Sequence, residues 1–350
     1  MSDAGACADR LWDAVVVGDE HGAADVVVKA VESGLDAETV LLDVIGAVQR
    51  RVGVEWAANR LTVAQEHAAT VINDRVIGVL ATVAERPVPH RERITVACVD
   101  GEWHALPARL LAEVLKLRGF RVDFLGAQVP APHLITHLHS TGPDAVALSS
   151  SIPTRLPTAH ATITACQAAG VPVLAGGSAF GPDGRFARLL GADLWAPDAR
   201  SAAELLASGP LPRPRNGHQP IDDLPHLGDQ EYTMVSRTGT QLVKAVYTGL
   251  EELFPVMRTY TDLQRQYTAE DLAHIVEFFA TSLYTGDDSL FLGFLSWTAE
   301  ILGARGVPPH FLPPALRLLA AELRDFPRAT RLLDRARVEL TTTLDDGPAA

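Results

Sequence analysis

Hydrophobic positions recur at helical spacing through the first 88 residues of the chain. Ala, Val and Leu dominate this region, and the runs are interrupted near Gly18, Gly34 and Gly53, where glycine favours a turn. Asp36 and Thr62 have the residue types and positions of helix N-caps. The pattern predicts four helices, over residues 6–17, 21–33, 37–52 and 62–84. Four such helices indicate a small bundle that occupies residues 1–88.

The pattern changes between residues 93 and 208, where short apolar runs alternate with amphipathic ones. This alternation is typical of parallel βαβ units and predicts a doubly wound sheet of the flavodoxin or Rossmann-like class. The predicted strands are residues 93–100, 121–127, 145–151, 172–177 and 192–196, and the helices between them are 106–118, 131–139, 158–169 and 185–190. Ligands of such sheets bind beyond the carboxyl ends of the strands, so the residues that follow each strand are the candidates for a binding site.

A second boundary follows the predicted sheet. Residues 209–229 are rich in Pro and Gly and predict an extended linker. Beyond it the pattern is helical only, which predicts an all-α domain over residues 230–343. The expected helices are residues 241–254, 269–283, 289–305, 314–325 and 328–341. The chain is therefore expected to be a multidomain α and α/β protein.

The composition narrows the functional classes. A net charge of −13 and a pI near 5.3 leave no basic face for nucleic acid or an anionic membrane. No apolar stretch reaches the roughly eighteen residues that cross a bilayer. Cys7, Cys98 and Cys166 have no zinc-site spacing and form no disulfide framework. We therefore expect a cytoplasmic protein that contacts neither nucleic acid nor membrane.

Candidate chemistry follows the predicted strands. The run Gly-Glu-Trp-His-Ala-Leu-Pro, residues 101–107, places Glu102 and His104 just past the first strand. A histidine at this point, with an acid two residues earlier, can aim one imidazole at a metal. Ser149 to Ser151 and the pair Gly176 and Gly177 follow two later apolar runs. All of these residues are expected at the carboxyl edge of the sheet.

In this order the pieces resemble the motif of the cobalamin-binding domain, Asp/Glu-x-His-x-x-Gly, then Ser-x-Leu, then Gly-Gly. The resemblance implies that His104 displaces the cofactor's own benzimidazole and becomes the lower cobalt ligand. Two positions depart from the motif, since Pro107 replaces its Gly and Ser151 its Leu, so the loop must turn differently. The cofactor-binding residues that the resemblance implies here are Glu102, His104, Ala105, Leu106, Ser149, Ser151, Gly176 and Gly177.

Trp56, followed ten and eleven residues later by Glu66 and His67, looks like the helical cap of light-responsive cobalamin photoreceptors. The resemblance implies adenosylcobalamin, with the indole packed on the adenosyl group and Glu66 and His67 above the corrin; Val63 belongs to the same expected site. In the DNA-binding photoreceptors a His follows the Trp and captures cobalt after photolysis, whereas this chain has Ala57. His67 and water are the alternatives for that upper ligand. No winged-helix DNA-binding domain precedes the bundle, so no DNA contact is expected.

The C-terminal helical run resembles sensory globin-like domains, and the chain as a whole is similar to the photocobilins, which pair cobalamin with biliverdin. The resemblance implies a biliverdin site with aromatic walls, cations for two propionates, and a donor to a pyrrole group. No Cys follows Cys166, so a bilin in this domain would be held without a thioether bond. The expected wall residues are Tyr260, Tyr267, Phe278, Tyr284, Phe294 and Trp297, the cations Arg258, Arg265 and Arg305, and the donor His274.

These observations favour a non-enzymatic light sensor that binds adenosylcobalamin and biliverdin. Its expected readout is a homo-oligomer whose state depends on light, and a separate downstream signalling protein is an expected further partner. Two alternatives stay open: a corrinoid methyl carrier of a methyltransferase system, and a partner-binding stress-sensor scaffold without chromophores. An adenosylcobalamin mutase is disfavoured because the sequence shows no substrate-binding barrel.

Overall fold

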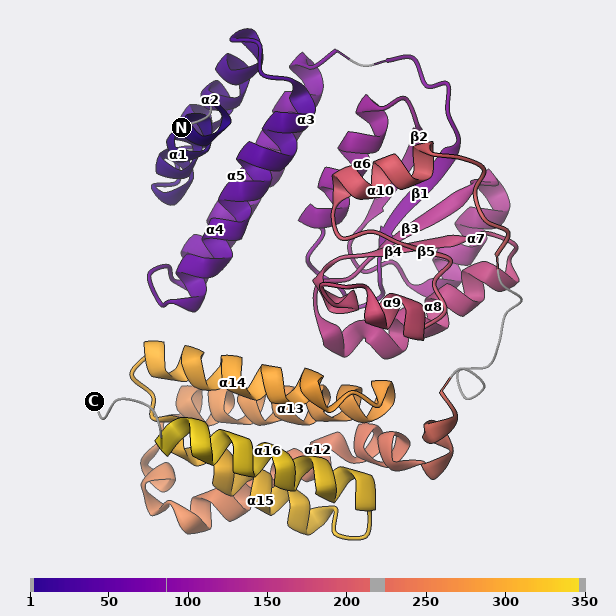
Figure 1. The fold of residues 1–350 in the computed structure, drawn as a ribbon. Helices are drawn as coiled ribbons and strands as arrows, with labels where there is room; N and C mark the ends of the chain where they lie inside the picture. Colours follow the sequence, from indigo (N-terminus) through magenta and orange to yellow (C-terminus); the bar gives the residue numbers. More distant parts are fainter. Residues whose placement is uncertain (1–2, 86, 215–223, 346–350) are drawn as a thin grey trace. The chain divides into compact units, whose positions relative to one another are not determined.

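The computed structural model describes residues 3–85, 87–214 and 224–345, and it divides the chain into two compact units, residues 1–219 and 220–350 (Figure 1). The first unit contains an N-terminal helical domain and a five-stranded parallel α/β domain, and the second is all-helical. This architecture confirms the predicted fold class. Of the predicted linker, residues 215–223 lie outside the described residues.

The N-terminal domain is built from helices that turn where the sequence predicts. Gly18 and Gly34 have positive φ angles of 77° and 96°, and the Asp36 carboxylate accepts a hydrogen bond from the Thr39 amide as an N-cap. Thr62 forms a full capping box with Gln65. The elements are α1 (Asp3–Val16), α2 (Glu20–Glu32), α3 (Ala37–Thr39), the π-helical segment η1 (Val40–Ile45), α4 (Gly46–Ala57) and α5 (Val63–Val83).

The expected break at Gly53 is wrong, because α4 continues through this residue to Ala57. One exposed glycine costs a helix only about 1 kcal/mol, and α4 offsets that cost by burying Val48 and Val52. The helix ends instead at Asn59, whose φ of 57° is left-handed. Trp56 therefore lies in the last turn of a helix and not in a loop.

The α/β domain has a sheet of five parallel strands in the order β2-β1-β3-β4-β5. β1 and β3 are buried at nearly every position, so helices cover both faces of the sheet. α6 packs against α10, and α7 against α8. The strands are β1 (Arg93–Cys98), β2 (Arg121–Gly126), β3 (Ala145–Ser149), β4 (Val173–Gly176) and β5 (Leu194–Trp195), and the helices are α6 (Leu106–Leu117), α7 (Ala131–Thr141), α8 (Leu156–Ala168), α9 (Arg185–Leu189) and α10 (Ala199–Ala207), with 3₁₀ turns at η2 (Pro153–Arg155) and η3 (Ser178–Phe180).

The helical bundle and the α/β domain share one hydrophobic core, in which α5 packs against α6. Ion pairs reinforce this junction. The Glu38 carboxylate accepts two hydrogen bonds from Arg118, at 2.9 and 2.7 Å, and a third from Arg200 at 3.2 Å. Arg200 also donates to Asp43 at 3.0 Å. These ion pairs therefore connect α3 and η1 of the bundle to Arg118 and Arg200 of the α/β domain.

The second unit has its own hydrophobic core, in which Phe279 and Phe291 are fully buried with ring centroids 5.3 Å apart. The buried Glu231, at the start of α12, accepts hydrogen bonds from the amides of Arg328 and Ala329 at 3.0 and 2.6 Å and so caps α16. The elements are η4 (Pro225–Asp229), α12 (Glu231–Leu253), η5 (Pro255–Thr259), α13 (Asp262–Thr285), α14 (Asp288–Ala304), η6 (Pro309–Phe311), α15 (Leu312–Glu322) and α16 (Pro327–Asp345).

The helices of the second unit begin earlier than the apolar pattern predicts. α12 starts at Glu231 and α13 at Asp262, where the expected starts are residues 241 and 269. Thr261 and Gln264 form a capping box that fixes the start of α13. Among the described residues, no helix is long and apolar enough to cross a membrane.

Candidate functional site

Glu102 and His104 form a close pair in the loop after β1. The Glu102 side chain is buried, and its Oε1 lies 2.6 Å from Nδ1 of His104 and accepts a hydrogen bond of 2.9 Å from the His104 amide. Its Oε2 accepts from the amides of Ser151 and Ile152, at 2.7 and 3.0 Å, and from the Ser150 hydroxyl at 3.2 Å. The loop after β3 thus positions the Glu102 carboxylate, which in turn orients the His104 imidazole.

Electrostatics agree with this geometry. Burial alone would raise the pKa of the Glu102 carboxyl, but the hydrogen bonds from His104, Ser151 and Ile152 outweigh it and lower the pKa to about 2. The same carboxylate raises the pKa of the His104 imidazole, which burial opposes, and Glu66 adds a smaller effect in the same direction. His104 is half-exposed, and its Nε2 has no hydrogen-bond partner among the described residues. The pair therefore presents one imidazole nitrogen, with fixed aim, to a ligand.

The departure at Pro107 has a local explanation. Ala105 precedes the first residue of α6, Leu106, and Pro107 occupies the first turn of the helix, where a proline costs no hydrogen bond. The loop turns before the helix, at Gly101, whose φ of 78° is in the left-handed region. His104 and Glu102 keep their relation although the motif's Gly is absent.

Ser149 and Gly176 are paired in the register of β3 and β4 and end these strands side by side. Gly177 has a φ of 98°, and a Cβ on it would lie 2.2 Å from the Ser150 carbonyl oxygen, so only glycine fits. Ser178 donates to the Ser151 carbonyl at 2.8 Å and links the two loops. A small cavity of about 100 Å³ opens at this edge and is lined by Ser149, Gly176 and Gly177, with Pro107, Ala108, Leu111, Ala147, Leu148, Leu174 and Ala196, Pro197, Asp198, Ala199 and Ala202.

The residues of the expected helical cap lie at the end of α4 and the start of α5. Trp56 is half-buried against the hydrophobic core, and Val63 and His67 are exposed at the start of α5. Glu66 lies 2.8 Å from Nδ1 of His67 through Oε2 and accepts a hydrogen bond of 2.9 Å from Thr70 through Oε1. Glu66 is the smallest of the influences that raise the pKa of His104, so the carboxylate of this segment lies within electrostatic reach of the loop imidazole.

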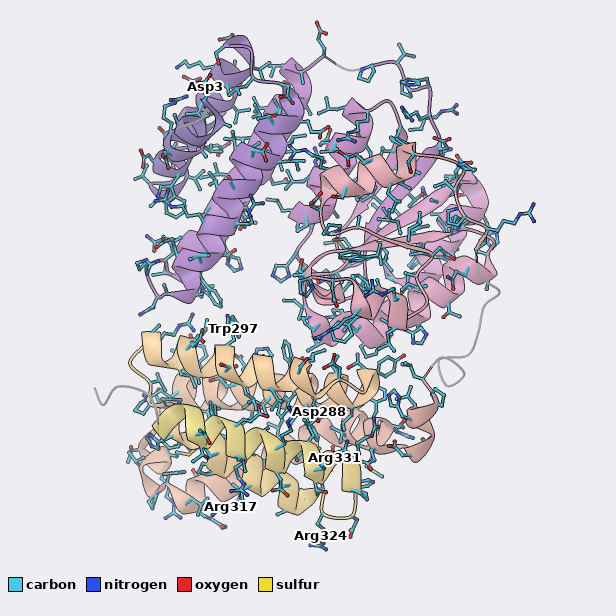
Figure 2. The ribbon with its side chains drawn as sticks, viewed as in Figure 1. Asp3, Asp288, Trp297, Arg317, Arg324 and Arg331 are labelled. Carbon is cyan, nitrogen blue, oxygen red and sulfur yellow. The ribbon has the colours of Figure 1, made fainter. Side chains whose placement is uncertain are left out.

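The predicted bilin residues are divided between exposed positions and the core of the second unit. Tyr267, His274 and Phe278 recur along one face of α13, and Phe278 stacks on Phe294 of α14 with ring centroids 3.8 Å apart. Trp297 is 45 % exposed and points away from the helices beneath it (Figure 2). Tyr284 instead lies in the core, edge-on to Tyr232.

The predicted cations lie near the ends of these helices. Arg258 is exposed in η5, and Arg265 donates to the backbone carbonyls of Tyr260 and Arg258 at 3.1 and 3.2 Å. Arg305 follows the last residue of α14. The structure thus brings Tyr267, His274 and Phe278 together on one face of α13, with Trp297 exposed on α14 and Arg265 near the start of α13, whereas Phe294 and Tyr284 belong to the buried core.

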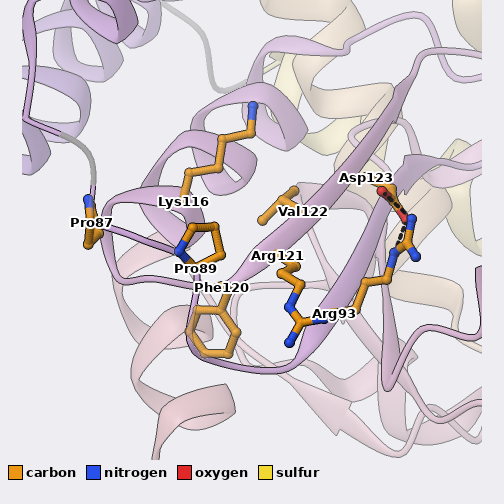
Figure 3. Close-up of a pocket in the computed structure, with 8 residues that line it drawn as sticks. All are labelled: Pro87, Pro89, Arg93, Lys116, Phe120, Arg121, Val122 and Asp123. Atoms are coloured by element: carbon orange, nitrogen blue, oxygen red, sulfur yellow. Dashed lines mark hydrogen bonds and ion pairs between the residues drawn. The ribbon is translucent and has the colours of Figure 1, made fainter.

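A larger hollow, of about 560 Å³, lies at the opposite edge of the sheet, where β1 and β2 begin (Figure 3). Its Arg93 is bound to Asp123 at 2.8 Å, and its Lys116 to Glu113 at 2.9 Å. Two of its cations are thereby neutralised, and the hollow adds nothing to the site at the carboxyl edge.

Comparison with known proteins identifies the first unit. Residues 92–207 match the model of the B12 binding domain, and residues 7–81 match a second B12 binding domain model. The HTH-type transcriptional repressors CarH and CarA of Myxococcus xanthus are 34% and 32% identical over 134 and 177 residues, which are 37% and 48% of this chain and 43% and 57% of theirs. The chain thus spans about half the length of these two relatives.

The fold agrees with a solved structure, the monomethylamine corrinoid protein of Methanosarcina barkeri. The match has a TM-score of 0.52 and 19% identity, and it covers 58% of this chain and 98% of that one. Neither domain match reaches into the second unit. The first unit therefore contains a Rossmann-like B12 binding domain, preceded by a helical domain that matches a second B12 binding domain model.

Proposed function

We propose that the protein is a light sensor that binds adenosylcobalamin between its bundle and its α/β domain, and biliverdin on its second unit. The observation that carries the first part is the pair of a buried Glu102 and a half-exposed His104, whose Nε2 is open and which lies within electrostatic reach of Glu66 in the bundle. The donor set fits a corrinoid, because imidazole is a good cobalt ligand and a carboxylate on its other nitrogen fixes its aim.

His104 would hold cobalt through Nε2 while its Nδ1–H donates to Glu102. A cofactor ligated by His104 has no use for its own benzimidazole beneath the ring, so that tail needs another place. We assign to it the cavity beside Ser149, Gly176 and Gly177, where Gly177 brings backbone close to Ser150 without a side chain in the way.

On the upper side, Trp56 and Val63 supply apolar surface for an adenine face, and Glu66 accepts hydrogen bonds from ribose hydroxyls. Bound adenosylcobalamin supplies a cobalt–carbon bond that light breaks. Trp56 and Glu66 would contact the adenosyl group only before this bond is broken, and that difference in contacts is what a two-state switch requires. Because Ala57 follows the Trp, His67 or water would be the candidate ligand for cobalt once the adenosyl group is lost.

The output is proposed as a light-dependent change in a homo-oligomer, read by a separate downstream signalling protein. The net charge of −13 disfavours direct contact with nucleic acid, in contrast to the repressor names of the two relatives. No catalytic role is assigned, and the protein acts as a sensor and not as an enzyme.

Biliverdin is proposed to lie on the half-exposed face of α13 and α14. Tyr267, Phe278 and Trp297 offer aromatic surface, and His274 lies on the same face of α13 as a donor. Arg258 and Arg265 would pair with the propionates. Binding is non-covalent, because the three cysteines all precede this unit.

The second candidate is a corrinoid methyl carrier, favoured by the fold shared with the monomethylamine corrinoid protein. A methyl group leaves no reason for an indole and a carboxylate above the corrin. The position of Glu66 therefore favours the larger, hydroxylated adenosyl group.

The test is the absorption spectrum of the full-length protein given adenosylcobalamin, methylcobalamin or biliverdin, in darkness and after illumination, followed by size-exclusion chromatography. We expect a histidine-ligated adenosylcobalamin spectrum that light converts, a shift in elution volume, and a biliverdin band distinct from the free pigment. Equal affinity for methylcobalamin with no change in elution would favour the methyl carrier. A biliverdin spectrum identical to that of the free pigment would remove the bilin from the proposal.

A further inference from the structure

A chain of polar side chains runs through the interface between α4 and α5 and ends at the cap carboxylate. Asn73 Nδ2 donates to Gln49 Oε1 at 2.7 Å, and Gln49 Nε2 donates to Thr70 Oγ1 at 2.8 Å. The Thr70 hydroxyl donates to Glu66 Oε1 at 2.9 Å. Asn73 is fully buried, so the chain connects the bundle core to Glu66.

The direction of every hydrogen bond in this chain follows from the carboxylate. A carboxylate only accepts, so the single proton of Thr70 must go to Glu66. The Thr70 oxygen then accepts, which requires the amide nitrogen of Gln49, and the Gln49 carbonyl in turn requires the amide nitrogen of Asn73. This order leaves Asn73 Oδ1 as the last acceptor, and that atom is buried without a partner among the described residues.

The chain also fixes how the two helices face each other. Glu66, Thr70 and Asn73 are four and three positions apart and share one face of α5. Gln49 and Trp56 are seven positions apart and share one face of α4. Because Gln49 bridges Thr70 and Asn73, it sets the rotation of α4 against α5 and thereby holds Trp56 in register with Glu66.

Stability does not explain this arrangement. A buried acceptor without a donor destabilises a fold, and well-packed apolar side chains at these positions would remove that cost. Side chains retained at such a cost are better explained by what they do to Glu66. The chain supplies Glu66 Oε1 with one donor and fixes its rotamer. Glu66 Oε2 also lies 2.8 Å from Nδ1 of His67, and the lone pairs that these two contacts leave can accept from donors outside the protein.

We infer that Gln49, Thr70 and Asn73 are positioning residues that orient Glu66 to accept hydrogen bonds from the upper ligand of cobalamin. They thereby select cobalamins whose upper group carries hydroxyl donors over those with a plain alkyl group. The inference rests on the proposed function, which puts Glu66 above the corrin.

The experiment compares Thr70→Val, which removes the hydroxyl at nearly equal volume, with Thr70→Ser, which keeps it. Dark dissociation constants of the full-length protein are measured for adenosylcobalamin and for methylcobalamin. Thr70→Val is expected to weaken adenosylcobalamin binding about tenfold, the effect of one charge-assisted hydrogen bond, and methylcobalamin less than about twofold. Thr70→Ser is expected to stay close to the parent for both.

A second variant, Gln49→Met with Asn73→Leu, removes the amides and the orphaned acceptor together. Its melting temperature without cofactor is expected to equal or exceed that of the parent while its preference for adenosylcobalamin falls. If the chain of hydrogen bonds were only structural, the variant would have a lower melting temperature and would keep its preference for adenosylcobalamin. That result, or a Thr70→Val variant that weakens both cobalamins equally, overturns the inference.

The same measurements separate this inference from the proposed function. If the parent prefers adenosylcobalamin and Thr70→Val keeps the full preference, only the positioning role is wrong. If the parent does not distinguish the two cobalamins, the proposed upper face fails and the positioning role fails with it.

Discussion

Replacing Glu102 with Gln tests the loop that aims His104. Gln keeps one carbonyl oxygen, so in either orientation its NH₂ group faces two donors. These are the amides of Ser151 and Ile152, or the amide and ring nitrogen of His104. Each buried donor left without an acceptor costs about 1–3 kcal/mol, so we expect Glu102→Gln to destabilise the first unit by about 3 kcal/mol. The lowering of the Glu102 pKa from 4.5 to about 2 corresponds to a similar value.

In a unit of this length, residues 1–219, 1 kcal/mol shifts the melting temperature by about 2–4 °C, so a fall of about 6–12 °C is expected for the cofactor-free protein. Differential scanning fluorimetry measures it, with the exposed acid Glu92, changed to Gln, as the control. A drop no larger than that of the Glu92 variant would refute the reasoning, because it would mean that the loop does not depend on the carboxylate. Cobalamin binding should weaken in Glu102→Gln but less than in His104→Ala, which loses the ligand itself and its histidine-ligated spectrum.

Three further changes test other parts of the first unit. Arg118 holds the pKa of the Glu38 carboxyl below its usual value, so its stabilisation is present above pH 4.5 and lost as the pH falls through the lowered pKa. Glu38→Gln should cost about 1–2 kcal/mol at neutral pH, and its melting curve should approach the parent's in acid. Gly177→Ala should weaken cobalamin binding and lower the melting temperature, whereas Gly78→Ala, in an open helical position, should be neutral or stabilising by about 1 kcal/mol. Trp56→Ala should retain cobalamin but reduce the difference between dark and light elution profiles; an unchanged difference would make Trp56 only part of the bundle core.

The fold was predictable where the hydrophobic period is strong. The strands of the α/β domain fall within a few residues of their predicted positions because each is short, apolar and bounded by turn residues. The start of α12 was missed because its first two turns bury only Glu231 and Val235 and so show little apolar periodicity. That start is fixed by a tertiary contact, the capping of α16 by Glu231, which no local pattern reveals.

The candidate site was also predictable from the sequence only in part. Glu102 and His104 are two positions apart, and their pairing could be predicted from spacing alone. The donors from Ser151 and Ile152 are backbone groups about fifty residues away, which a sequence motif does not display. Gln49 and Asn73 resemble solvated helix positions in the sequence, and only the packing of α4 on α5 turns them into a partly buried chain of hydrogen bonds.

The two carboxylates of the proposed site are each supported from within one domain. Glu102 receives its donors from the loops of the α/β domain, and Glu66 receives Thr70 from the bundle. Neither of these two supports therefore crosses from the bundle to the sheet. The ion pairs of Glu38 and Asp43 hold the bundle at one end of the helical run, and Trp56 lies thirteen residues beyond Asp43, about 20 Å along the helix. If the proposed adenosyl group packs on Trp56, its loss removes a contact at the Trp56 end of this helical run and leaves the ion pairs at the Glu38 end in place.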